Sequence, residues 1–171
     1  MRMIFTAMLA TGLVSGGASM GLAQDGHAGP AEVVSKVREA AALLAEKGAA
    51  GLEVIRDKAS EFTWKDTYIF VVDCEADKVM ANSAFPARVG GDIKQHTDYN
   101  GKQYGLELCE TAKRPGGGWV EYVWPRPGGG KPSRKISFVM SVDGLPYQLG
   151  AGIYDETITL EKLDRLTTGA Q

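Results

Sequence analysis

The sequence is poor in the residues on which many enzymes and nucleic-acid-binding proteins depend. Its 171 residues include only two His and two Cys, and its 19 Lys and Arg form no basic run. The lack of such a run predicts no nucleic-acid partner. No Ser-His-Asp order, metal-ligand cluster or recognisable carboxylate pair occurs, so the sequence offers no catalytic residues, no metal site and no cofactor. We therefore expect a protein that is not an enzyme.

Long apolar runs are also missing, except at the N-terminus. Residues 3–14 are largely apolar, follow Arg2, and lead into small residues that end at Ala23. This pattern predicts a signal peptide over 1–23, cleaved after about Ala23 and followed by a flexible segment over 24–29. No later run is long enough to cross a bilayer. We expect an exported protein, periplasmic or secreted.

The two cysteines, Cys74 and Cys109, both fall in the exported part. An even number of cysteines in an oxidising compartment favours a disulfide. A bridge closing a loop of this length contributes roughly 3–4 kcal/mol in the chain-entropy model. The alternative is a thiol nucleophile in an exported enzyme, for which only His27 and His96 could serve as the base.

Periodicity of apolar residues predicts the order of the elements. Residues 30–60 have helical spacing, and Gly48 and Gly51 weaken the middle, so one long bent helix or two helices are expected. Later segments predict a hairpin, a short helix, three strands and a final helix. Their ranges are 67–73 with 78–81, 103–113, 119–124, 134–142, 147–153 and 155–168. This order predicts an α+β fold with one antiparallel sheet of about five strands.

The segment 119–124 is unusual because both of its faces carry large aromatic residues. Strand alternation directs Trp119 to one face and Tyr122 and Trp124 to the other. A core needs only one apolar face. We therefore infer that this strand is covered on both sides, and that one of the two covers could be a ligand.

Several motifs together carry a family resemblance. They are FVVDCEADKVMAN (70–82), DYNGKQYGLELCETAK (98–113), GGGWVEYVWPRPG (116–128), KPSRKISFVMSVDG (131–144) and GAGIYDE (150–156). Their order and spacing resemble the single Cache domain of type 2, the PAS-like extracellular sensor module of bacterial chemoreceptors and sensor kinases. The resemblance implies one domain over 30–168, with a PAS-like core over 64–156 and the long helix 30–60 packed against its sheet.

The chain departs from the family pattern in two respects. Many members carry a His-Pro step after the second strand, where this chain has Asn82 to Pro86. Receptors of the family also place the module between two membrane spans. We therefore expect a free-standing exported form, without a transmembrane or signalling part of its own.

The resemblance also implies a small-molecule pocket on the sheet face away from the long helix, roofed by residues 82–113. Small carboxylates or similar metabolites are the implied ligands. The candidate ligand-binding residues are Tyr68, Phe70, Arg88, Tyr122, Trp124, Lys135 and Ser137. Lys135 would be the counter-ion of a carboxylate, and Arg88 a second clamp. Alternatively, Lys135 faces solvent on the polar side of its strand and Arg88 lies on the surface.

These expectations combine into a ligand-binding sensor for signal transduction or chemotaxis-type sensing, with a membrane-bound sensor protein as a potential partner. The alternative function is a ligand-free structural or interaction module with the same fold, which forms a homodimer through the helix 30–60. A cavity of ligand size with Lys135 or Arg88 directed into it separates the two hypotheses.

Overall fold

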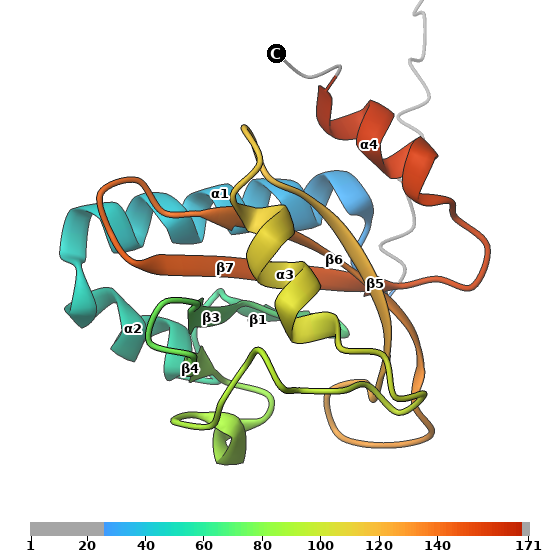
Figure 1. Ribbon diagram of the computed structural model, residues 1–171, viewed down its shortest axis with the longest axis horizontal. Helices are drawn as coiled ribbons and strands as arrows, with labels where there is room; N and C mark the ends of the chain where they lie inside the picture. Colours follow the sequence, from blue (N-terminus) through green and yellow to red (C-terminus); the bar gives the residue numbers. More distant parts are fainter. Residues whose placement is uncertain (1–25, 169–171) are drawn as a thin grey trace, which may run out of the picture.

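The computed structural model describes residues 26–168 as one antiparallel sheet with helices on both of its faces (Figure 1). The predicted signal peptide over 1–23 lies outside these residues. In residues 26–168, no helix has the length and apolar character needed to cross a membrane. In chain order the elements are α1 (Pro30–Lys47), α2 (Ala49–Arg56), β1 (Thr63–Trp64), β2 (Thr67–Tyr68), β3 (Phe70–Asp73), β4 (Lys78–Asn82), the 3₁₀ helix η1 (Pro86–Arg88), α3 (Tyr104–Ala112), β5 (Gly118–Trp124), β6 (Ser133–Ser141), β7 (Tyr147–Tyr154) and α4 (Leu160–Thr168).

The main sheet has the strand order β4-β3-β7-β6-β5, and every neighbouring pair is antiparallel. Strands β5, β6 and β7 form a meander, and the hairpin of β3 and β4 joins it along β7. Strands β1 and β2 form a separate two-stranded ribbon. The predicted α+β fold with a five-stranded antiparallel sheet is confirmed.

The helical N-terminal part is divided into two helices. α1 ends at Lys47 and α2 begins at Ala49, because Gly48 has a φ of 55°, which residues other than glycine rarely adopt. α2 ends at Arg56, so a continuous helix over 30–60 is wrong, and the broken arrangement is the one present. The side chain of Arg56 donates to the carbonyl of Met80, which fixes α2 to β4.

Both faces of the sheet carry a hydrophobic core, which explains the aromatic residues on both faces of β5. On one face α1 and α2 pack with Trp119 and Phe138 in the first core. On the other face α3 packs with Tyr122 and Trp124 in the second. Figure 1 shows α1 and α3 on opposite sides of the strands. The strand was therefore correctly expected to be covered on both sides.

Asp66 holds the start of the described chain, and the last helix begins later than predicted. Ala28 donates its N–H to Asp66 Oδ1 at 2.9 Å, and His27 Nδ1 lies 2.8 Å from the other oxygen of the same carboxylate. His27 and Ala28, within the segment expected to be flexible over 24–29, thus contact Asp66, and the flexibility of that segment stays a prediction. The last helix begins at Leu160 rather than at residue 155, because the carboxylate of Asp155 accepts N–H groups of the next residues and forms a turn.

Candidate ligand-binding site

A small cavity lies between the sheet and the connection from β4 to α3, on the face opposite α1. Its volume is about 30 Å³, which leaves room for about two water molecules. Twelve residues line it: Tyr68, Phe70, Val72, Val79, Asn82, Arg88, Ile93, His96, Tyr104, Leu108, Tyr122 and Trp124. The apolar walls with a few polar groups are typical of a small-molecule site.

Aromatic rings form most of the walls. The ring of Tyr104 in α3 is stacked on Tyr122 in β5, with the ring centroids 4.3 Å apart and the planes 13° apart. Trp124 lies 5.4 Å from the same Tyr104 ring. Phe85, from the loop after β4, meets Tyr68 edge-on at 5.6 Å. These contacts hold the roof of the cavity, α3 and the preceding loop, closely against the sheet.

A disulfide fixes this roof covalently. Cys74, directly after β3, is bonded to Cys109 in α3, with their Cα atoms 5.8 Å apart. The predicted disulfide is therefore present, and in this state neither sulfur can act as a nucleophile. Gly105 brings the same helix against the loop, because a Cβ at this position would lie 1.7 Å from the carbonyl oxygen of Ile93.

Arg88 lies on the loop side of the cavity. Its guanidinium stacks over the ring of Trp124, 4.6 Å from the centroid. Nη1 of Arg88 lies 2.9 Å from Nε2 of His96, to which it donates when the imidazole is neutral. Burial and, to a lesser degree, the charge of Arg88 lower the pKa of His96, which favours this neutral form. Arg88 is thus half-buried beside the cavity and not on the open surface.

Lys135 of β6 is the most deeply buried Lys or Arg among residues 26–168. Its side chain is fully buried, and its Nζ has no hydrogen-bond partner among residues 26–168. Nζ lies over the ring of Tyr68, 4.2 Å from the centroid. Three further rings surround it at 5.6 to 5.9 Å, those of Phe70, Tyr122 and Tyr154. Gly152 of β7 makes room for this side chain, because a Cβ there would lie 2.5 Å from Lys135 Cε.

The environment of Lys135 balances its charged and neutral forms. Burial lowers the pKa of Lys135 to about 7, and the carboxylate of Asp66 opposes this shift. Asp66 is already engaged by the Ala28 N–H and by Arg126, so it is not a dedicated counter-ion. The faces of the surrounding rings attract a cation and offset part of the cost of burial. A bound anion would shift the balance towards the ammonium form.

Ser137 orients the central tyrosine. It is fully buried on β6, and its Oγ lies 2.9 Å from the hydroxyl of Tyr122. Burial raises the pKa values of Tyr122 and Tyr68 well above their usual range, so both hydroxyls stay neutral. Neutral hydroxyls are hydrogen-bond donors, the kind of group that an anion requires.

The structure gathers all seven sequence-predicted ligand residues in this one region. Five line the cavity itself: Tyr68, Phe70, Arg88, Tyr122 and Trp124. Lys135 and Ser137 contact its tyrosine walls from β6, so exposure of Lys135 on a solvated face is excluded. Sequence reasoning did not select Asn82, His96 or Tyr104. Tyr104 shared a helical stripe with Leu108, which was a usable signal, whereas His96 stood alone in a polar loop.

Comparison with known proteins identifies the family. The sequence profile described as "Cache domain" matches residues 54–159, well over half of the chain. The chain therefore belongs to the Cache domain family, as its motifs indicated, and the structure contains a single domain of this kind with a PAS-like sheet.

The curated relatives are bacterial signalling proteins. The chain is 36% identical over 91 residues to the sensor histidine kinase MctS of Rhizobium johnstonii, a match that covers 53% of this chain and 19% of MctS. It is 26% identical over 125 residues to the methyl-accepting chemotaxis protein McpP of Pseudomonas putida, covering 72% of this chain and 22% of McpP. The chain thus spans about a fifth of the length of the curated relatives it matches.

Solved structures agree with this assignment. The periplasmic sensor domain of a chemotaxis protein is 29% identical, with a TM-score of 0.55, and the match covers 71% of this chain and 87% of that domain. A Cache chemosensory domain studied for carboxylic acid recognition is 24% identical, with a TM-score of 0.62 and coverage of 74% and 92%. The similarity to this Cache chemosensory domain is a similarity of fold. Both neighbours are sensor domains, and the first, a periplasmic one, supports a periplasmic location for this domain.

Proposed function

We propose that this Cache domain binds a small carboxylate, with Lys135 as its counter-ion, and serves as the sensing part of a signal-transduction or chemotaxis-type system. The amine of Lys135 is the observation that carries the proposal. It is fully buried and has no hydrogen-bond partner in the described part of the chain. A buried amine without a partner costs the fold stability, and such groups concentrate at functional sites.

The chemistry around Lys135 favours a carboxylate over other small molecules. An ammonium group and a carboxylate form a charge-assisted hydrogen bond, which is strongest where water is excluded. Arg88 supplies a second cation beside the cavity. A cation ligand would be repelled by both groups. The carboxylic acid recognition studied in a neighbouring Cache structure is consistent with this choice.

The size of the cavity limits the ligand. A cavity of about 30 Å³, with room for about two water molecules, restricts the ligand to the smallest carboxylates, and any ligand larger than acetate requires the loop over 83–103 to move outward. The disulfide holds α3 at Cys109, so we place the opening on the side of Arg88. Occupancy would be communicated to a membrane-bound signalling protein, since the curated relatives are a sensor kinase and a chemotaxis receptor.

A thermal-shift screen of the purified protein with acetate, propionate, amino acids and amines tests the proposal. A ligand at a hundred times its Kd adds about 2.7 kcal/mol, a shift of several degrees in Tm for a domain of this size. We expect a shift with the short carboxylates that is lost in Lys135→Met and kept in Lys131→Met, which replaces an exposed lysine. An equal shift in both variants, or none with any carboxylate, would contradict the site.

A further inference from the structure

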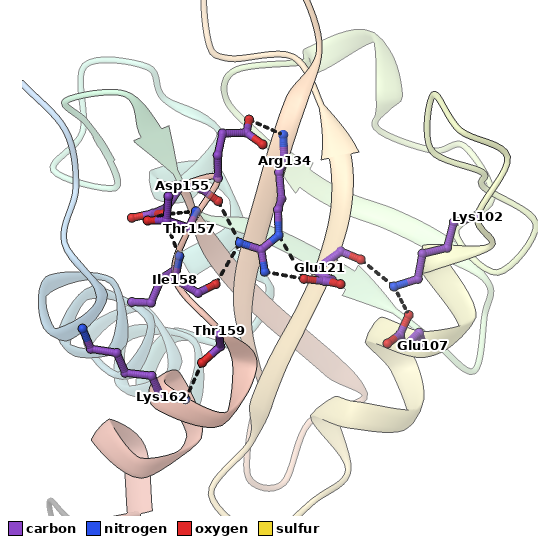
Figure 2. Close-up of polar contacts among 10 residues, drawn as sticks. Lys102, Glu107, Glu121, Arg134, Asp155, Thr157, Ile158, Thr159 and Lys162 are labelled. Atoms are coloured by element: carbon purple, nitrogen blue, oxygen red, sulfur yellow. Dashed lines mark hydrogen bonds and ion pairs between the residues drawn. The ribbon is translucent and has the colours of Figure 1, made fainter.

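Arg134, the neighbour of Lys135 on β6, connects three elements on the face opposite the cavity (Figure 2). Its Nε donates to Glu121 Oε2 at 3.0 Å, and Nη2 pairs with the same carboxylate of β5. Its Nη1 donates to the carbonyl oxygens of Asp155 and Ile158 at 2.8 and 2.9 Å. Arg134 therefore ties β6 and β5 to the turn that leads from β7 into α4.

The roof of the cavity reaches the same residue of β5. Lys102, just before α3, donates from Nζ to the carbonyl oxygen of Glu121 at 2.5 Å. It also pairs with Glu107 of α3 at 2.7 Å. Glu121 precedes Tyr122, whose ring is stacked on Tyr104 of the roof. The roof, the cavity wall and Arg134 are thus joined through one short piece of β5.

The turn that Arg134 holds is compact and continuous with α4. Asp155 Oδ1 accepts the N–H groups of Thr157 and Ile158 at 2.7 and 2.9 Å. These hydrogen bonds lower the pKa of Asp155, so its carboxylate stays ionised near neutral pH. Thr159 Oγ1 accepts the N–H of Lys162 at the start of α4. The turn and the helix are therefore linked closely enough to move together.

α4 lies against α1 and β5 along one side. Leu163 is fully buried, whereas Leu166 is 51% exposed, so the helix rests on the domain by one side. A short helix that is attached along one side, near the end of the described residues, belongs to the less stable part of a structure. Its position is therefore sensitive to the strength of the Arg134 contacts.

We propose that Arg134 is a positioning residue that couples occupancy of the cavity to the position of α4. The inference rests on the proposed anion site at Lys135. An anion bound there restrains β6 and β5 from the cavity side. Because Arg134 and Glu121 belong to these two strands, they then hold the turn before α4 more firmly, and α4 fluctuates less.

Hydrogen exchange measured by mass spectrometry tests this coupling in the purified protein with and without saturating acetate. In the wild type, exchange of peptides covering 155–168 slows on acetate binding by about twofold to thirtyfold. In Arg134→Lys, a single ammonium cannot replace the guanidinium fork. This variant keeps its acetate affinity by calorimetry and loses the slowing over 155–168.

Two further variants make the test specific. Glu121→Gln removes the carboxylate but keeps the carbonyl that Lys102 contacts, and it produces the same loss of coupling. If Arg134→Lys fails to fold, Glu121→Gln alone tests whether Arg134 couples the cavity to α4. Arg165→Lys, on the exposed side of α4, retains the full slowing. Acetate binding with unchanged slowing in both Arg134→Lys and Glu121→Gln overturns the coupling alone. Absence of acetate binding in the wild type overturns the anion site and the coupling with it.

Discussion

Replacing Lys135 with Met is expected to make the protein more stable while it abolishes anion binding. The lysine has a folded pKa of about 7, against 10.5 when unperturbed, a difference equivalent to roughly 5 kcal/mol of destabilisation below pH 7. The attraction of the four surrounding rings for the ammonium is part of the balance that sets this folded pKa. Met is unbranched, apolar and packs well on aromatic rings. We expect a net gain of a few kcal/mol, and at most about 5 kcal/mol, in the free energy of unfolding.

The pH dependence of this gain has a definite sign. Because the folded pKa of Lys135 is lower than the unfolded value, the unfolded chain binds more protons between about pH 7 and 10.5. The wild type therefore gains stability as the pH rises through this window. Met does not titrate. The advantage of the variant is full below about pH 7 and disappears above about pH 10.5.

Urea denaturation of the wild type and Lys135→Met at about pH 6 and about pH 9 measures both quantities, with the disulfide kept oxidised. Lys131→Met is the matched control, because it removes a lysine that is already in water. A Lys135→Met variant that is clearly less stable than the wild type at pH 6 would refute the reasoning. It would show that the amine already has a strong partner in the folded protein.

Three further predictions follow from the same site. Acetate affinity falls by up to about tenfold per pH unit above about pH 7, because Lys135 must take up a proton to pair with the anion. Calorimetry at about pH 6 to 9 measures this affinity, and a constant value over the range contradicts the prediction. Gly152→Ala forces a Cβ to within 2.5 Å of Lys135 Cε, so it destabilises the fold by about 1–3 kcal/mol and weakens acetate binding. Gly26→Ala, whose added Cβ meets nothing within 4 Å, is the control. Denaturation and calorimetry show unchanged stability and unchanged acetate affinity for this control. The double variant Cys74→Ser, Cys109→Ser lacks the disulfide between two residues that are 35 positions apart. Its free energy of unfolding falls by about 3 kcal/mol, and hydrogen exchange in α3 becomes faster. Unaltered hydrogen exchange in α3 would mean that the roof of the cavity is held without the disulfide.

The sheet could be predicted because its signals are local. Alternation along 119–124 directed Trp119 to one face and Tyr122 to the other, and each lies in a separate core. The weak point between α1 and α2 was visible at Gly48, which has a positive φ, but the sequence left one bent helix and two helices as alternatives. The start of α4 was not predicted, because the turn at Asp155 depends on side-chain hydrogen bonds that periodicity does not record.

The site could be predicted only in part, because its polar members are set by tertiary contacts. Alternation placed Lys135 and Ser137 on one face of their strand, but it could not say whether that face meets solvent or α3. The structure places both side chains in the interior. His96 and Asn82 reach the cavity from irregular segments, whose course depends on packing rather than on period. The hydrogen bonds of Arg134 could not be predicted from the sequence either, because its partners lie up to 24 residues away along the chain.

A crystal structure of the protein grown with acetate tests the central claim most directly. We predict electron density for the ligand between the tyrosine rings, with a carboxylate oxygen about 2.7–2.9 Å from Lys135 Nζ and the loop over 83–103 closed over it. A well-ordered protein in saturating acetate that leaves Nζ of Lys135 without an anion would contradict the account.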